Sequence, residues 1–166
     1  LSKESGVIAN PYALELINAT NIKFFIGNGT VEKGTPDINV KLLKNWVHVV
    51  GTYDGQYLKV YIDGALSGTP NNIGLHALSV PRGHYSVGAR SCRYDFFPGI
   101  IASVRIYSRA LSESEIQQNY YAVAFGNCTP VRDSSLVLEL TPASIDPQSG
   151  TWRDTSGNGN HGTIYG

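Results

Sequence analysis

Short runs in which apolar and polar residues alternate fill the first two thirds of the chain. Tyr12–Ile17 and Ile22–Ile26 are rich in β-branched, aromatic and other apolar residues and are separated by Asn-Ala-Thr-Asn, so they predict an antiparallel pair of strands. Trp46–Tyr53 alternates more regularly, and an Asp-Gly pair joins it to Gln56–Ile62, which ends on a second Asp-Gly pair. Because Asp-Gly favours the tight turns of hairpins, this is the clearest hairpin that the sequence predicts.

Two more strands and one helix follow along the chain. His84–Gly88 and Gly99–Tyr107 carry the β-branched and aromatic residues typical of strands. Ser112 and Glu115 have the spacing of a capping box, which predicts that a short helix follows over Ile116–Tyr121. Many short strands with turns at regular intervals are typical of an all-β sandwich.

The composition of the chain changes after the predicted helix. Residues 126–135 include Cys128 and Pro130 and have no periodic pattern, so they predict a linker between residues 1–125 and residues 136–166. Leu136–Leu140 (LVLEL) is then predicted to form another strand. The chain is therefore expected to hold one β-sandwich unit, a linker and a short second segment.

Three segments between Trp46 and Tyr120 have a distinctive sequence: WVHVVGTYDGQYLKVYIDG, YSVGAR and FPGIIASVRIYSRALSESEIQQNY. They resemble the laminin G-like, concanavalin A-like jelly-roll domains of secreted and surface proteins. The resemblance implies an all-β sandwich of two antiparallel sheets with one short helix. It also implies that alternate residues of the strands point inward, namely Trp46, Val47, Val49, Leu58, Val60, Ile62, Val87, Ile101, Val104 and Ile106.

The order of the segments differs from the order in that family. Segments that resemble LVLEL and WRDTSGNGNHGTIYG open a domain of the family, whereas here they occupy residues 136–166, and several central strands have no counterpart. The fold is therefore expected to be incomplete or permuted. Either residues 136–166 complete their own sandwich, or they complete a neighbouring copy or adjacent domain in an array or fibre; we predict the second arrangement.

The charge of the chain excludes partners that are recognised mainly by charge. It has 13 Lys and Arg against 13 Asp and Glu, so nucleic acid and anionic membranes are not predicted partners. No run of about 18 apolar residues is present, so no membrane insertion is predicted.

Three sequons and two cysteines point to an exported protein. Asn18, Asn28 and Asn127 each begin an Asn-x-Thr sequon and are predicted to carry N-glycans. Cys92 and Cys128 are predicted to form a disulfide, with two buried thiols as the alternative. These features predict a secreted or cell-surface location.

The sequence predicts no catalytic site. Some concanavalin A-like glycosidases carry two acids two residues apart on one strand, and no predicted strand has that arrangement. Glu113 and Glu115 have this spacing, but their positions at the start of the helix indicate capping. Ser, His and Asp residues are scattered and no nucleophile motif is present, so the chain is predicted not to be an enzyme.

Two segments are candidates for ligand binding. Asp154, Asn158 and Asn160 place oxygen atoms in a glycine-rich loop and predict a calcium site, with Asx turns as the alternative. An aromatic loop beside Cys92 predicts a glycan site in which Tyr94 stacks on the sugar, and the alternative is that the aromatic residues plug the end of the sandwich. The residues of this loop are Arg93, Tyr94, Asp95, Phe96 and Phe97.

Taken together, the chain is expected to be a non-catalytic β-sandwich module that acts in adhesion or surface structure, with other copies of itself or adjacent domains as partners. The alternative is a carbohydrate-binding module of a secreted glycoside hydrolase.

Overall fold

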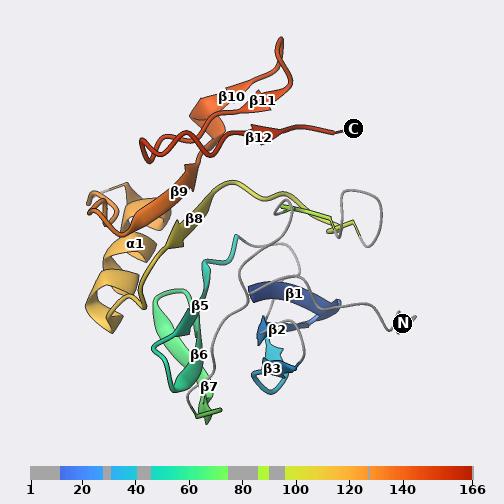
Figure 1. The fold of residues 1–166 in the computed structure, drawn as a ribbon, viewed down its shortest axis with the longest axis vertical. Coiled ribbons are helices and arrows are strands. Elements are labelled where there is room, and N and C mark those ends of the chain that lie inside the picture. Colours follow the sequence, from blue (N-terminus) through green and yellow to red (C-terminus); the bar gives the residue numbers. More distant parts are fainter. Residues whose placement is uncertain are drawn as a thin grey trace. The chain divides into compact units, whose positions relative to one another are not determined.

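The computed structural model describes residues 12–27, 31–40, 46–74, 86–89, 96–126 and 128–165. The chain divides into two compact units, each built from two segments. The first unit comprises Leu1–Tyr85 and Ser112–Thr129, and the second comprises Ser86–Leu111 and Pro130–Gly166. Strands make up most of the regular structure in both units (Figure 1), which confirms the predicted all-β fold.

The first sheet of the first unit is built around one central strand. β1 (Tyr12–Asn18) pairs antiparallel with β2 (Asn21–Gly27), and β2 also pairs with β3 (Glu32–Gly34) and β4 (Ile38–Asn39). The turn between β1 and β2 is fixed by Asn18 itself, whose Oδ1 accepts the backbone N–H groups of residues 20 and 21. The predicted antiparallel pair is therefore confirmed.

The second sheet of this unit is a meander of β5 (Val49–Tyr53), β6 (Tyr57–Ile62) and β7 (Ala65–Asn72). Both Asp-Gly pairs form the predicted turns. Asp54 Oδ1 accepts the backbone N–H groups of residues 56 and 57, while Asp63 and Gly64 both have positive φ, as a tight hairpin turn requires. The pattern did not predict β7, because its glycine and proline are rare inside strands.

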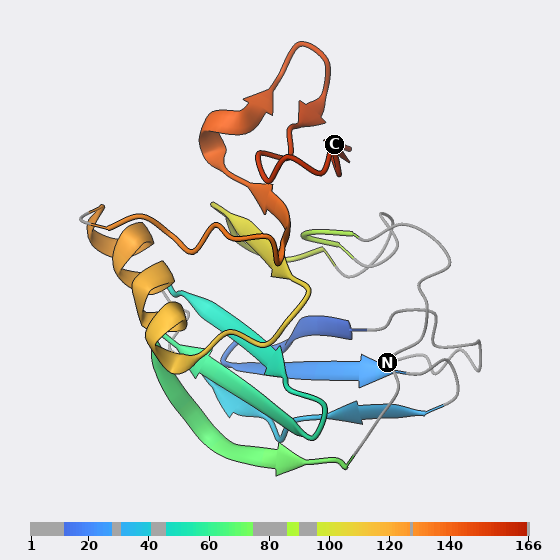
Figure 2. The same cartoon turned by 60° about the vertical axis from the view of Figure 1, so that its left-hand side comes forward.

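The core of the first unit lies between its two sheets (Figure 2), because alternate residues of β2 and β6 face each other. Gly51 of β5 approaches β2 so closely that a Cβ at this position would lie 2.6 Å from the ring of Phe24. The buried core residues are Ile22, Phe24, Ile26, Ile38, Val40, Leu58 and Val60.

The predicted set of inward-facing residues is partly wrong. Leu58 and Val60 are buried as expected. Trp46, however, is 69% exposed because it precedes the first residue of β5. Val87 is 42% exposed because residues 86–89 form a bend where the sequence predicted a strand, and the remaining predicted residues are half-buried.

The helix α1 (Glu113–Phe125) begins at the predicted capping box. Glu115 N–H donates to the Ser112 hydroxyl oxygen, and the Glu115 carboxylate accepts the Ser112 backbone N–H at 2.8 Å. The helix runs four residues beyond the predicted end, and Gly126 stops it in the left-handed conformation with φ of 65°.

The second unit contains a two-stranded sheet and a three-stranded sheet. β8 (Val104–Tyr107) pairs antiparallel with β9 (Leu136–Leu140), so the first strand after the predicted linker pairs within its own chain. β8 begins five residues later than predicted, because residues 98–103 form bends and irregular structure. A short 3-10 helix (Pro142–Ser144) then leads to the second sheet, which consists of β10 (Ile145–Asp146), β11 (Thr151–Trp152) and β12 (Gly162–Thr163).

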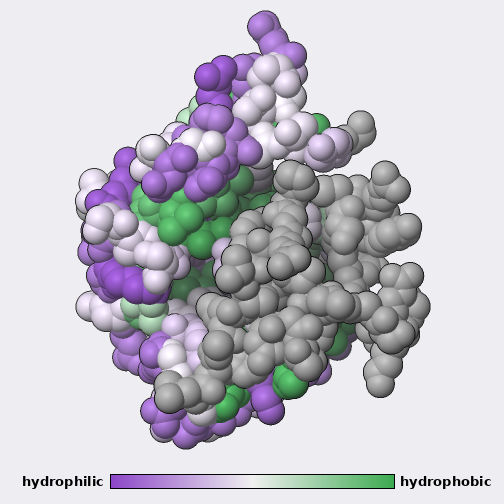
Figure 3. Space-filling model, in the orientation of Figure 1, coloured by the Kyte–Doolittle hydropathy of each residue, from purple (hydrophilic) through white to green (hydrophobic). Residues whose placement is uncertain are grey.

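The β8–β9 pair has one apolar face, to which both strands contribute through the register Val104↔Leu140 and Ile106↔Leu138. Hydrophobic surface gathers over these two strands in Figure 3. The other face carries Arg105 and Glu139, which stand directly opposite each other across the pair.

Candidate functional site

A glycine-rich loop of the second unit, residues 154–160, folds against β9. The loop is shaped by Gly157 and Gly159, which have φ of 95° and 73° and so occupy a region that other residues rarely adopt. His161 holds the start of the loop, since its Nδ1 accepts the backbone N–H of Asp154 at 3.0 Å. We refer to these residues as the 154–160 loop.

Asp154 is the centre of this loop. Its Oδ1 accepts the backbone N–H groups of Glu139 at 2.9 Å and Ser156 at 2.8 Å, and its Oδ2 accepts the Asn160 N–H at 2.9 Å and the Ser156 hydroxyl at 2.8 Å. Burial raises the pKa of the Asp154 carboxyl, but the hydrogen bonds from these donors outweigh it and hold the pKa below its ordinary value.

The two asparagines of the loop bind the backbone of β9. Asn158 Nδ2 donates to the carbonyl oxygens of Leu136 at 2.8 Å and Val137 at 3.2 Å. Asn160 Nδ2 donates to the Val137 carbonyl at 2.9 Å, and the Ser156 hydroxyl donates to the same oxygen at 3.1 Å. The loop is thus fastened to the strand through its side chains.

The structure therefore brings Asp154, Asn158 and Asn160 together, as the sequence predicted. Calcium is bound by oxygen atoms that face the ion, and most of the polar groups here face the protein instead. Both oxygens of Asp154 already accept two hydrogen bonds each, and both asparagines point an NH2 group at β9. These contacts favour the Asx-turn alternative, and calcium binding stays a prediction.

A buried carboxylate lies next to the loop. Glu139 is fully buried, and its Oε1 accepts Arg105 Nε at 2.8 Å while its Oε2 accepts an Arg132 guanidinium N–H at 2.8 Å and the Thr155 hydroxyl at 2.9 Å. Burial raises the pKa of Glu139, but the hydrogen bonds from Arg105 and Thr155 and the arginine charge lower it by more.

The sequence pattern did not predict this cluster. One signal was available, because Glu139 interrupts the apolar run LVLEL and Arg105 interrupts the apolar run of β8. A charge inside a buried strand is rare unless it is paired. The contribution of Arg132, which comes from the predicted linker, could not be inferred from strand pairing.

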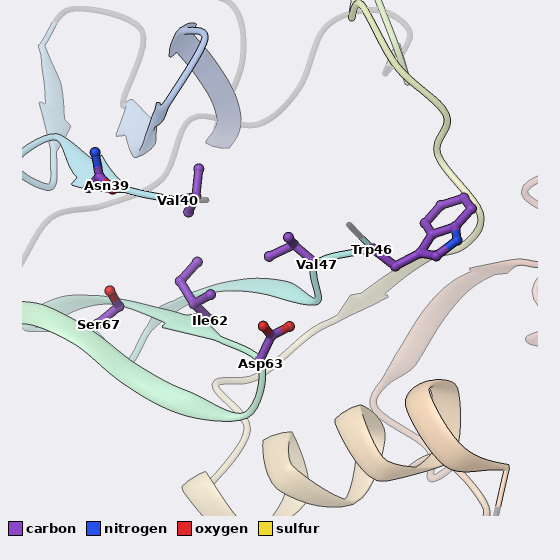
Figure 4. Close-up of a pocket in the computed structure, with 7 residues that line it drawn as sticks. All are labelled: Asn39, Val40, Trp46, Val47, Ile62, Asp63 and Ser67. Carbon is purple, nitrogen blue, oxygen red and sulfur yellow. The ribbon is translucent and has the colours of Figure 1, made fainter. Parts of the chain in front are cut away.

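A cavity of about 330 Å³ lies within the first unit, between its two sheets (Figure 4). Ile62 and Val47 point into it, whereas the indole of Trp46 points away. Asp63 at its rim is engaged, since its Oδ1 accepts the His48 backbone N–H at 2.9 Å. The cavity is lined by Asn39, Val40, Trp46, Val47, Ile62, Asp63 and Ser67.

The predicted glycan loop is described only in part. Arg93, Tyr94 and Asp95 lie outside the described residues, so their role stays a prediction. Phe96 is 69% exposed, while Phe97 is half-buried and donates its backbone N–H to the carbonyl of residue 88. Phe96 therefore has the exposure that a stacking platform needs.

The predicted modifications fall mostly outside the described residues as well. Asn28, Asn127 and Cys92 are among the residues that the structure does not describe, and Cys128 is exposed. Asn18 is exposed in the turn between β1 and β2. The three N-glycans and the Cys92–Cys128 disulfide stay predictions.

The two acidic residues at the start of α1 occupy the cap and first-turn positions that were predicted for them. Glu115 closes the capping box, and Glu113 Oε1 accepts the Tyr61 hydroxyl at 3.5 Å. Within the described ranges, no group of three or more His, Cys, Asp or Glu side chains is placed to hold a metal ion. Nor does any helix in the described parts of the chain have the length and apolar character needed to cross a membrane.

Comparison with known families agrees with this architecture. A laminin G family model, described as the concanavalin A-like lectin/glucanases superfamily, matches residues 2–117. The chain belongs to this superfamily. Its superfamily match covers both sheets of the first unit and β8 but ends before β9, so the 154–160 loop lies outside the matched region.

Among solved structures, this superfamily member is similar to residues 221–444 of an S-layer domain-containing protein from Clostridium thermocellum ATCC 27405. The identity is 25%, with a TM-score of 0.35, over 72% of this chain and 59% of the other chain. The chain thus spans somewhat over half the length of that structure. No curated protein matches the chain.

Proposed function

We propose that the chain is a non-catalytic module of a secreted or cell-surface protein and that it acts in adhesion or surface structure. One observation carries the non-catalytic part: Glu139 and Asp154, the two buried carboxylates of the described residues, are each held by several donors. A glycosidase acid must face the scissile bond with its carboxyl group available. These two groups instead stabilise the fold around β9.

The test is a hydrolysis assay on soluble polysaccharides with the purified chain. We expect no product above the rate with buffer alone. Reproducible hydrolysis that is lost when a carboxylate of the chain is changed to an amide would contradict the proposal.

The structural role is proposed to include assembly with other copies or with adjacent domains. Exposed apolar side chains of the second unit support this proposal, since exposed apolar surface favours association. Ile100 is 77% exposed, Ile145 44% and Ile164 45%. In the single chain, β9 pairs with its own β8, so exchange between copies would require this pair to open. Sedimentation velocity over a range of concentrations tests the proposal, and a single monomeric species throughout would contradict assembly between copies.

A second candidate function is carbohydrate binding, and two exposed aromatic residues favour it. Trp46 and Phe96 are each 69% exposed, and a flat apolar ring in solvent is what a sugar ring stacks on. We expect Trp46→Ala or Phe96→Ala to weaken binding on a glycan array, while Tyr165→Ala, which changes another exposed ring, leaves it unchanged. Binding that survives both changes would rule out these platforms.

A further inference from the structure

The strand β9 has two edges, and only one of them faces β8. In an antiparallel pair, the backbone groups of alternate residues point toward the partner strand and those of the residues between point away. Leu138 and Leu140 stand opposite Ile106 and Val104 in the register. The backbone N–H and carbonyl groups of Glu139 bind the 154–160 loop. The backbone groups of residues 137 and 139 therefore point to the outer edge of β9, away from β8.

The 154–160 loop satisfies this outer edge as a neighbouring strand would. Asp154 Oδ1 accepts the Glu139 N–H at 2.9 Å, and the Thr155 N–H donates to the Glu139 carbonyl at 2.9 Å. The Val137 carbonyl accepts side-chain donors of Ser156, Asn158 and Asn160 at 2.9 to 3.2 Å. Backbone donors and acceptors that a partner strand could use are thereby occupied.

Bonds inside the loop help to hold its shape. The Asp154 carboxylate gathers the N–H groups of Ser156 and Asn160, and the two glycines with positive φ allow the chain to curl around it. A loop with its own internal hydrogen bonds loses less conformational entropy when it binds the strand, which helps it to compete with an incoming strand.

We propose that the 154–160 loop closes the outer edge of β9 and prevents this edge from pairing with β9 of a second copy of the chain. An unpaired edge is a template for strand addition, and a loop that covers it is one means by which proteins avoid this. The segment LVLEL is short and mostly apolar and forms an antiparallel strand pair with β8. A second copy presents the same edge of β9, so it is the partner that we expect an open edge to find. The inference concerns this edge alone and stands apart from the proposed function.

The test opens the edge by changing Asn158 and Asn160 to Ala together, which removes donors to β9 and leaves Asp154 in place. Gln148→Ala, an exposed polar residue of the same unit, is the matched control. We expect the double variant to form dimers or larger species that grow with concentration in sedimentation velocity. In hydrogen exchange, we expect the Glu139 amide to exchange roughly tenfold faster or more. The loop that carries its acceptor Asp154 should open more often once the asparagine donors to β9 are lost.

A third substitution separates edge pairing from other association. Val137 is partly exposed on β9, and Val137→Lys places a charge on the open edge, which opposes strand pairing. Added to the double variant, it should restore the wild-type distribution, and in the wild-type chain it should change nothing because the edge is closed.

Three results would overturn the proposal: an unchanged exchange rate at Glu139, a faster rate without association, or association that Val137→Lys leaves intact. If the double variant does not fold, Asn160→Ala alone removes one donor, and the same measurements decide.

Discussion

Glu139 shows how one buried charge ties several segments of the second unit together. Its carboxylate joins Arg105 of β8, Arg132 from the segment before β9 and Thr155 of the 154–160 loop. A buried carboxylate is costly unless it is paired and hydrogen-bonded, and here both conditions are met. The group therefore fixes the mutual positions of these segments.

We predict that Glu139→Gln destabilises the protein by about 3 kcal/mol, because it leaves the largely buried Arg105 without its counter-ion. Urea unfolding of the variant and the wild-type chain measures the difference. Glu15→Gln, the same change at an exposed position of β1, is the control and should change the free energy of unfolding by less than about 0.5 kcal/mol. A Glu139 variant as stable as the control would show that the cluster contributes nothing.

The carboxylates of the second unit also predict acid sensitivity. The Ser135 hydroxyl and Arg109 lower the pKa of Asp133 from 3.8 to about 2, and Arg153 and Ser149 do the same for Asp146. Hydrogen bonds likewise hold the pKa values of Glu139 and Asp154 below their ordinary values, against the effect of burial. In each case the unfolded chain binds protons at a higher pH than the folded chain does.

The stabilisation from these groups is therefore present above about pH 4 and lost as the pH falls toward about 2. We predict that the melting temperature decreases steadily from about pH 5 to about pH 3, as scanning calorimetry would record. Asp146→Asn should make this decrease shallower, because the amide does not titrate. A melting temperature that stays level or rises in acid would contradict the prediction.

At the scale of elements, local signals decide where α1 and the hairpins begin and end. The capping box of Ser112 and Glu115 starts the helix, and Gly126 ends it. The helix buries only Ile116 and Asn119 among its described residues. Because it gains little stability from buried side chains, its capping residues contribute a large share of its stability.

We predict that Ser112→Ala lowers the free energy of unfolding by about 1 kcal/mol, because the Glu115 N–H loses its acceptor. The measurement is urea unfolding followed by far-ultraviolet circular dichroism. Gln117→Ala, at an exposed position inside the same helix, is the control and should be neutral or slightly stabilising. Equal stability of Ser112→Ala and wild type would mean that the cap is dispensable.

At the scale of the whole molecule, the two compact units do not follow the order of segments along the sequence. Each unit is assembled from two segments, and the second unit joins β8 to strands that follow the predicted linker. The predicted linker, residues 126–135, is divided between the two units. Gly126 caps α1 in the first unit, and Arg132 forms an ion pair with Glu139 in the second.

We predict that Cys92 and Cys128 are joined when the protein is made in an oxidising compartment. The closed loop holds β8 and α1, and by chain entropy its closure would stabilise the protein by about 3 to 4 kcal/mol. Mass spectrometry after alkylation, with and without reduction, measures it, and the expected result is labelling only after reduction. Alkylation of both cysteines in the native, unreduced protein would rule the bond out.

The sequence by itself determined the elements whose cause is local. The pairs Tyr12–Ile17 with Ile22–Ile26 and the two Asp-Gly turns follow from alternation and turn chemistry, and the helix start follows from its cap. The glycine-rich turn of residues 154–160 could also be inferred, since aspartate, asparagine and glycine favour such turns in any context.

Only the tertiary structure decided what those elements do. The strand β8 depends on a neighbour far away in the sequence, because it pairs with β9 through Arg105↔Glu139. The same holds for the 154–160 loop, because its side chains suit either a cation or a strand edge. The approach of β9, 15 or more residues away in the sequence, supplies the backbone groups that these side chains bind in the structure.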